Sequence, residues 1–153
     1  RCITDLASKY GMNDCKPVST PAAPGTVLTP RPEDESPLPE DHSYRTLVGS
    51  LIYLSTHSRP DMSQAAGALA RCLKSPASRH WKAAKRVLAY LFHHRDLGLC
   101  YKPGGNDNEV ECYTDSNFAT EPNGRSVGGY FTFLNSNLTN WKSSTQFTPN
   151  THW

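Results

Sequence analysis

Basic side chains around one predicted helix are the residues of this sequence whose types and spacing best suit a chemical task. They are Arg79, Lys82, Lys85, Arg86 and Arg95. Lysine and arginine neutralise phosphate groups and release counterions without reading base sequence. These cations therefore form a candidate surface for nucleic acid. The alternative is an ordinary solvated helix face, and the residue types alone leave both open.

The charge of the chain is unevenly distributed. Residues 42–102 contain ten Lys and Arg against two acids, a net charge of +8, whereas residues 103–124 contain five acids and no Lys or Arg. This pattern would attract a polyanion to the first stretch and a cation to the second. Solvated surfaces would also produce it.

Thiol and imidazole chemistry is a weaker candidate. The five cysteines are odd in number, scattered, and never spaced as Cys-x-x-Cys, which predicts reduced thiols in an intracellular protein instead of disulfides or a zinc site. His80, His93 and His94 are poor candidates for metal ligands, because adjacent histidines rarely point to one ion. We expect Trp81 and Trp141 to be core aromatics.

Hydrophobic periodicity predicts the elements that position these residues. A short amphipathic turn covers 3–10 and ends at Gly11, and helices cover roughly 44–55, about 60–73 and about 77–91. Ser58-Arg59-Pro60-Asp61 and Ser75-Pro76 resemble helix start signals. Strands are predicted at 110–115, 129–134 and 138–142, with a hairpin turn at 135–137. The fold class is therefore α+β, a small helical bundle followed by an antiparallel β meander.

The stretch between residues 17 and 39 holds seven of the twelve prolines. Proline removes backbone donors and restricts the preceding residue, so this stretch is predicted to be an extended, solvated connector. No apolar run is long enough to cross a membrane, and the first residues lack a secretory pattern. The absence of an initial Met suggests a fragment or a processed chain.

Several segments together resemble the Pol polyprotein of copia-type retrotransposons. They are residues 10–21, 44–54, 59–61, 80–91, 98–101, 113–117 and 141–144. Their order and spacing match the family up to about Gln146. The resemblance implies the end of a reverse transcriptase palm region over 1–16, a Pro-rich acidic connector over 17–43, and a thumb- or connection-like helical segment over 44–102. A truncated ribonuclease H-like meander over 108–146 and a divergent tail over 147–153 follow.

The resemblance also assigns chemistry. Ribonuclease H cleaves the RNA strand of an RNA–DNA hybrid with two Mg²⁺ ions held by carboxylates, and Asp115 resembles its first metal-binding aspartate. This chain has Asn117 where the family often has a second acid, but positions beside this site vary in role, so Asn117 does not indicate a lost ligand. The loss lies in the later Glu-Ala-Glu helix, which this chain lacks together with the Tyr-x-Asp-Asp motif of the polymerase. One carboxylate cannot hold two Mg²⁺ ions, so we expect Asp115 to be an incomplete site that binds no Mg²⁺ tightly.

The sequence thus predicts a reverse transcriptase and ribonuclease H fragment without catalysis of its own that binds an RNA–DNA hybrid or DNA duplex weakly. Its partners would be nucleic acid and the remaining parts of the polyprotein, with no membrane, in a cytoplasmic virus-like particle or the nucleus. Two alternatives stay open: a degenerate reading frame without activity, and an interaction module that needs a partner chain. A meander without covering helices should leave large apolar side chains partly exposed. They are Tyr130, Phe131, Phe133, Leu134 and Trp141.

Overall fold

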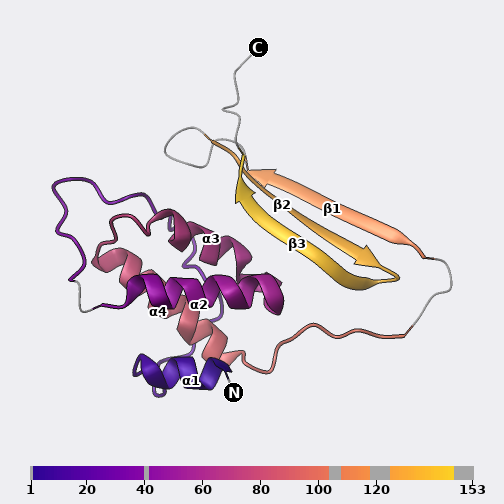
Figure 1. Ribbon diagram of the computed structural model, residues 1–153, viewed down its shortest axis with the longest axis horizontal. Helices are drawn as coiled ribbons and strands as arrows, with labels where there is room; N and C mark the ends of the chain where they lie inside the picture. The colour runs from indigo at the N-terminus through magenta and orange to yellow at the C-terminus, as the bar shows by residue number, and fades with distance from the viewer. Residues whose placement is uncertain (1, 40–41, 104–107, 118–124, 147–153) are drawn as a thin grey trace, which may run out of the picture. The chain divides into compact units, whose positions relative to one another are not determined.

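The structure, a computed structural model, consists of two compact units, which we call the helical unit (Arg1–Gly98) and the sheet unit (Leu99–Trp153). It describes residues 2–39, 42–103, 108–117 and 125–146. Figure 1 shows helices in the first unit and an antiparallel sheet in the second. The predicted α+β class is confirmed, and the predicted tail over 147–153 lies outside the described residues.

The helical unit contains α1 (Cys2–Lys9), α2 (Tyr44–His57), the 3-10 turn η1 (Pro60–Met62), α3 (Ser63–Arg71) and α4 (Ser78–His93). Leucine is the most frequent residue of its core, and most of these leucines lie at helical spacing on three helices. Leu47, Leu51, Leu69, Leu88 and Leu91 are all less than 2% exposed. Gly11 follows α1 at a φ of +62°, where glycine is favoured, and the Met12 amide closes the helix end on the Ala7 carbonyl at 2.8 Å.

The predicted cap at Ser58 is wrong, whereas the helical turns predicted from about 60 and 77 begin at Pro60 and Ser78. Ser58 does not cap a new helix, because α2 continues to His57 and the Ser58 amide closes that helix on the Leu54 carbonyl at 3.0 Å. Pro60 begins the short η1 turn instead. Helix α4 begins at Ser78, after Ser75-Pro76, and Nδ1 of His80 accepts the Ala77 amide at 2.8 Å. A histidine therefore occupies the place that Glu or Gln has in a capping box.

The Pro-rich stretch is irregular and most of its residues are exposed, as its composition predicts, but some of its apolar side chains pack against the helices. Leu38 is 8% exposed and joins the core of the helical unit, and Leu28 packs against that core. The Leu38 amide donates to the Pro76 carbonyl at 2.9 Å. Burial of these apolar side chains holds the stretch against the helices.

The sheet unit contains β1 (Val110–Asn117), β2 (Val127–Leu134) and β3 (Asn137–Thr145), in the order β1-β2-β3 with both pairs antiparallel. The predicted meander is therefore confirmed. Asn135 and Ser136 have φ values of 49° and 62°. Positive φ at both central residues is typical of a two-residue type I′ hairpin, which agrees with the turn predicted there.

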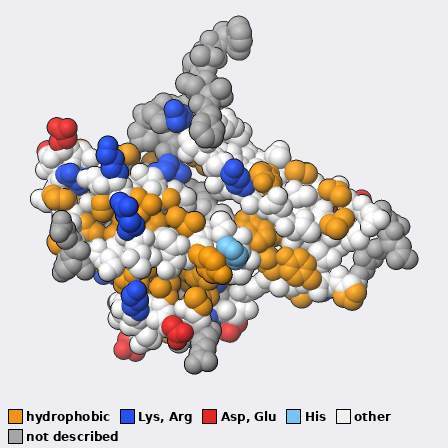
Figure 2. All heavy atoms as spheres, viewed as in Figure 1, with side chains coloured by type: hydrophobic (Ala, Val, Ile, Leu, Met, Phe, Trp, Pro, Cys, Tyr) orange, Lys and Arg blue, Asp and Glu red, His pale blue; other side chains and the backbone are white. Residues whose placement is uncertain are grey.

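Apolar side chains of the sheet unit are exposed (Figure 2). Phe131 is 43% and Leu134 40% exposed, and Tyr130, Phe133 and Trp141 are partly exposed. This confirms the predicted exposure of all five. Within the described residues, no helix is both long and apolar enough to cross a membrane.

Candidate nucleic-acid-binding helix

Helix α4 carries most of the predicted cations. Arg79, Lys82 and Arg86 are spaced at three and four residues and so share one side of the helix, which we call the basic face of α4. Lys85 lies next to Trp81, and Arg95 follows the end of the helix. In Figure 2, Lys and Arg side chains are spread over the helical unit.

The guanidinium of Arg79 already binds other residues of the chain. Its Nη1 donates to Thr29 Oγ1 at 3.0 Å, and its Nη2 donates to the Thr29 and Pro30 carbonyls at 3.1 and 3.2 Å. Its Nε lies 3.1 Å from Oε2 of Glu35. These contacts neutralise its charge and fix the Pro-rich stretch on α4, so a phosphate would have to compete with four oxygen atoms for this guanidinium.

The other four cations are more available. Lys82 and Arg95 are exposed. Nζ of Lys85 lies 5.8 Å from the centre of the Trp81 ring, and the Arg95 guanidinium 5.4 Å from that of Phe92, which are cation–π distances that leave the charge unneutralised. Arg86 donates from Nη2 to Thr20 Oγ1 at 3.1 Å. No carboxylate among the described residues forms an ion pair with any of these four.

The three histidines near α4 hold other parts of the chain. Nδ1 of His80 accepts the Ala77 amide, and its Nε2 donates to the Thr29 carbonyl at 2.8 Å. Nε2 of His93 lies 2.7 Å from the Cys15 carbonyl, and Nε2 of His94 3.2 Å from that of Val18. Their contacts with Thr29, Cys15 and Val18 could not be predicted from the sequence, because these residues lie more than fifty positions away along the chain.

A second cluster, also missed by sequence reasoning, surrounds Asp61. Arg59, which is 2% exposed, donates from Nε and Nη2 to the Asp61 carboxylate at 2.9 and 2.7 Å, and from Nη1 to the His94 carbonyl at 3.0 Å. The Tyr90 hydroxyl donates to the same carboxylate at 2.8 Å. Partial burial alone would raise the pKa of Asp61, but the hydrogen bonds and charge of Arg59 together with Tyr90 lower it below its usual value. The Arg-Pro-Asp run shows only a helix start at the level of sequence, because its partners Tyr90 and His94 are distant along the chain.

Asp115 lies on β1, opposite Gly129 of β2. It is exposed, and its Oδ1 accepts the amide of Ser116 at 2.8 Å. The described residues contain no group of three or more His, Cys, Asp or Glu side chains that could hold a metal ion. This donor set does not fit a pair of Mg²⁺ ions, which requires several converging carboxylates.

Comparison with known proteins gives several relatives. The chain is 36% identical over 147 residues to the retrovirus-related Pol polyprotein from transposon RE2 of Arabidopsis thaliana. The matched residues make up 95% of this chain and 10% of that protein. It is 33% identical over 149 residues to the retrovirus-related Pol polyprotein from transposon TNT 1-94 of Nicotiana tabacum, and these residues make up 94% of this chain and 11% of that protein. It thus spans about a tenth of the length of these relatives.

A third relative is close to this chain in length. The Secreted RxLR effector protein 161 of Plasmopara viticola is 36% identical over 106 residues, which make up 69% of this chain and 74% of that protein. No protein-family model matches the sequence, and no solved structure matches the chain.

Proposed function

We propose a function from one premise, namely that this chain belongs to the Pol polyproteins of copia-type retrotransposons and forms a fragment of one. In this proposal the chain has no catalysis of its own and supports the polyprotein by binding the phosphate backbone of an RNA–DNA hybrid or DNA duplex. The observation that carries the proposal is the set of cations on and after α4 that no described carboxylate neutralises: Lys82, Lys85, Arg86 and Arg95. Such cations bind phosphates without reading sequence.

The proposal assigns each unit a place in the polyprotein. The helical unit would be the thumb- or connection-like segment beside the polymerase, and the sheet unit the start of a ribonuclease H-like domain. The meander order β1-β2-β3, with Asp115 on its first strand, supports the second assignment. The remaining parts of the polyprotein would be its partners, in a cytoplasmic virus-like particle or the nucleus.

Salt-dependent binding tests the nucleic-acid role. If Lys82, Lys85 and Arg86 each neutralise one phosphate, the affinity for a labelled hybrid should fall with salt. The triple variant Lys82→Ala, Lys85→Ala, Arg86→Ala should then reduce the slope of log affinity against log salt concentration by about 2–3. Binding can be measured by fluorescence anisotropy at several salt concentrations.

Two further variants serve as controls. Arg45→Ala removes an exposed cation of α2 and should change the slope little. Arg79→Ala should mainly reduce stability, because Arg79 is bound to Thr29 and Glu35. Binding that is absent or independent of salt, or that falls equally in Arg45→Ala, would refute the proposed role.

The proposed lack of catalysis is tested with the same hybrid. Purified chain incubated with Mg²⁺ should leave the RNA strand intact, because Asp115 has no converging carboxylates among the described residues. Asp115→Asn should behave like the unchanged chain. Cleavage that Asp115→Asn abolishes would show that the chain is an active nuclease.

The exposed apolar side chains of the sheet unit favour a second candidate function, an interaction module that needs a partner chain. A degenerate reading frame would have the same exposed side chains. The flanking genomic sequence separates the two, since an in-frame Tyr-x-Asp-Asp upstream and Glu-Ala-Glu downstream would supply the rest of an enzyme. Stop codons there would instead indicate a relic.

A further inference from the structure

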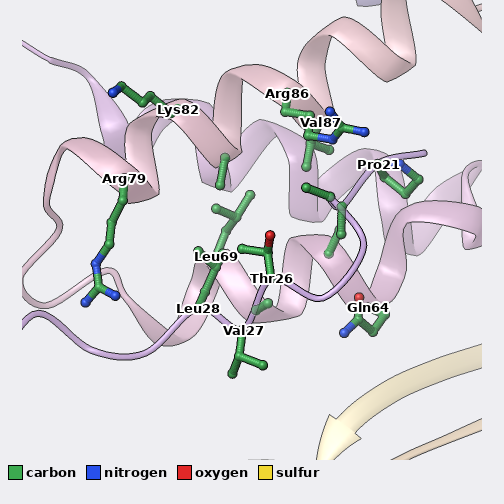
Figure 3. A pocket seen from close by; sticks show the side chains of 15 residues that line it. Pro21, Thr26, Val27, Leu28, Gln64, Leu69, Arg79, Lys82, Arg86 and Val87 are labelled. Carbon is green, nitrogen blue, oxygen red and sulfur yellow. The ribbon is translucent and has the colours of Figure 1, made fainter. Parts of the chain in front are cut away.

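A pocket of about 430 Å³ lies beside the basic face of α4, entirely within the helical unit (Figure 3). Its walls come from α3, α4 and the irregular residues Pro21–Leu28. Pockets that bind small molecules typically range from about 300 to 1,000 Å³, so this one has a suitable size. The nucleic-acid role proposed above involves Lys82 and Arg86 at its edge but not its apolar interior, and the remnant site at Asp115 belongs to the sheet unit.

Small apolar side chains create the hollow. Ala65 and Ala68 of α3 and Ala83 of α4 line the pocket together with Leu69 and Val87, and further apolar side chains come from the residues Pro21–Leu28. Alanines at these positions leave space that larger side chains would fill. Because the lining holds no aromatic ring, it offers no platform on which a nucleobase could stack.

One edge of the pocket is positively charged, and no acidic side chain lines it. Figure 3 shows that Arg79, Lys82 and Arg86 all come from α4. Glu35 neutralises Arg79, whereas Lys82 and Arg86 have no carboxylate partner among the described residues. The Nε of Arg86 is also buried without a hydrogen-bond partner, and an unsatisfied buried donor of this kind is costly.

We propose that this pocket binds a small apolar acid. The apolar body would lie against the alanines of α3 and α4, and the acid group would be bound by Arg86, with Lys82 contributing charge. An arginine–carboxylate contact supplies charge-assisted hydrogen bonds that a neutral ligand cannot form. The inference does not depend on the proposed function, and its test contains no nucleic acid, so each can fail without the other.

Octanoate is a suitable probe for the full chain, with methyl NMR of labelled Ala and Val residues as the readout. We expect saturable shifts at the methyl groups of Ala65, Ala68, Ala83 and Val87. Octanol and octylammonium are matched neutral and cationic probes of the same chain length. Octanoate should bind about tenfold more tightly than octanol, and octylammonium should bind more weakly than octanol.

Variants locate the acid group and the apolar body. Arg86→Gln should weaken octanoate about tenfold and leave octanol unchanged, whereas Lys85→Gln, which removes the same charge from α4 but does not line the pocket, should change neither. Ala83→Leu should fill the space and reduce the binding of both. If Ala83→Leu fails to fold, Arg86→Gln still decides.

Three results would overturn the proposal. The first is equal affinity for octanoate and octanol. The second is an equal loss of octanoate binding in Lys85→Gln and Arg86→Gln, which would indicate unspecific attraction. The third is methyl shifts at Val110 or Val127 of the sheet unit without shifts at the pocket alanines.

Discussion

The Asp61 carboxylate connects two distant parts of the helical unit. It is bound by Arg59 just before η1 and by Tyr90 near the end of α4. The guanidinium of Arg59 is almost completely buried, so loss of its partner would leave a charge in a poorly solvated place. Breaking such a pair from one side is more destabilising than the net contribution of the pair suggests.

Replacing Asp61 by Asn tests this contribution. We expect Asp61→Asn to reduce the free energy of unfolding by about 2 kcal/mol, because a hydrogen-bonded charge is lost beside buried Arg59. Urea unfolding followed by circular dichroism at 222 nm measures it. Asp96→Asn, at an exposed acid, should change stability by less than about 0.5 kcal/mol, and an equal effect of both variants would contradict this role.

The difference in unfolding free energy between the unchanged chain and Asp61→Asn should depend on pH. The pKa of Asp61 in the folded chain is lower than the ordinary value of 3.8, so its stabilising effect is complete well above pH 4 and decreases as the pH falls through the folded-state pKa. The stability gap between the unchanged chain and Asp61→Asn should therefore shrink below about pH 4. A gap that stays constant down to pH 2 would show that the carboxylate charge is not its source.

Helix α4 holds the irregular segments of the helical unit in place. Its first turn holds the Pro-rich stretch through His80 and Arg79, both bound to Thr29. Its last turn and the residue after it contact Cys15 and Val18 through His93 and His94. Residues that precede α2 in sequence are thus fixed along α4 by side chains that also end or begin the helix.

His80 is the residue that tests this arrangement. We expect His80→Ala to destabilise the helical unit by about 2–4 kcal/mol, because the Ala77 amide and the Thr29 carbonyl each lose a partner and a cavity forms. It should also speed cleavage of the Pro-rich stretch after Glu33 or Glu35 by a glutamyl endopeptidase.

The conservative variant His80→Gln should recover part of the stability, since glutamine suits the same capping position and can also donate to Thr29. Lys85→Ala is the matched control, because Lys85 contacts Trp81 and not the Pro-rich stretch. Unchanged cleavage in His80→Ala would mean that the stretch is held without His80.

At the scale of the whole molecule, the two units differ in how well they bury apolar surface. The helical unit has a core of fully buried leucines, whereas Tyr113 of the sheet unit is 59% and Phe131 43% exposed. Hydrophobic stabilisation is roughly proportional to the apolar area removed from water, so these exposed side chains stabilise the sheet unit less than a closed core would. The sheet unit is therefore the less stable part.

Separate unfolding of the two units tests this difference. Trp81 lies in the helical unit and Trp141 in the sheet unit, so fluorotryptophan NMR can follow both in one urea titration. We expect the Trp141 signal to change at lower urea than the Trp81 signal, and Trp81→Phe and Trp141→Phe would assign these two among the three tryptophan signals. Coincident transitions would show one cooperative unit.

The sequence by itself determined the elements and their order. Regular apolar spacing predicted the helices, alternation predicted the strands of the meander, and Gly11 and Asn135-Ser136 marked a helix end and a turn. These signals are local, because each depends on side chains a few residues apart. Family membership could also be inferred from short segments in a fixed order.

The tertiary structure alone decided which side chains the fold uses. It bound Arg79 and His80 to Thr29, joined Asp61 to Tyr90, buried Leu38 of the Pro-rich stretch, and left Lys82 and Arg86 beside an apolar pocket. Each of these contacts joins residues far apart along the chain. Composition and spacing carry no record of such pairs, because burial and the pairing of backbone carbonyls are settled only when the helices pack.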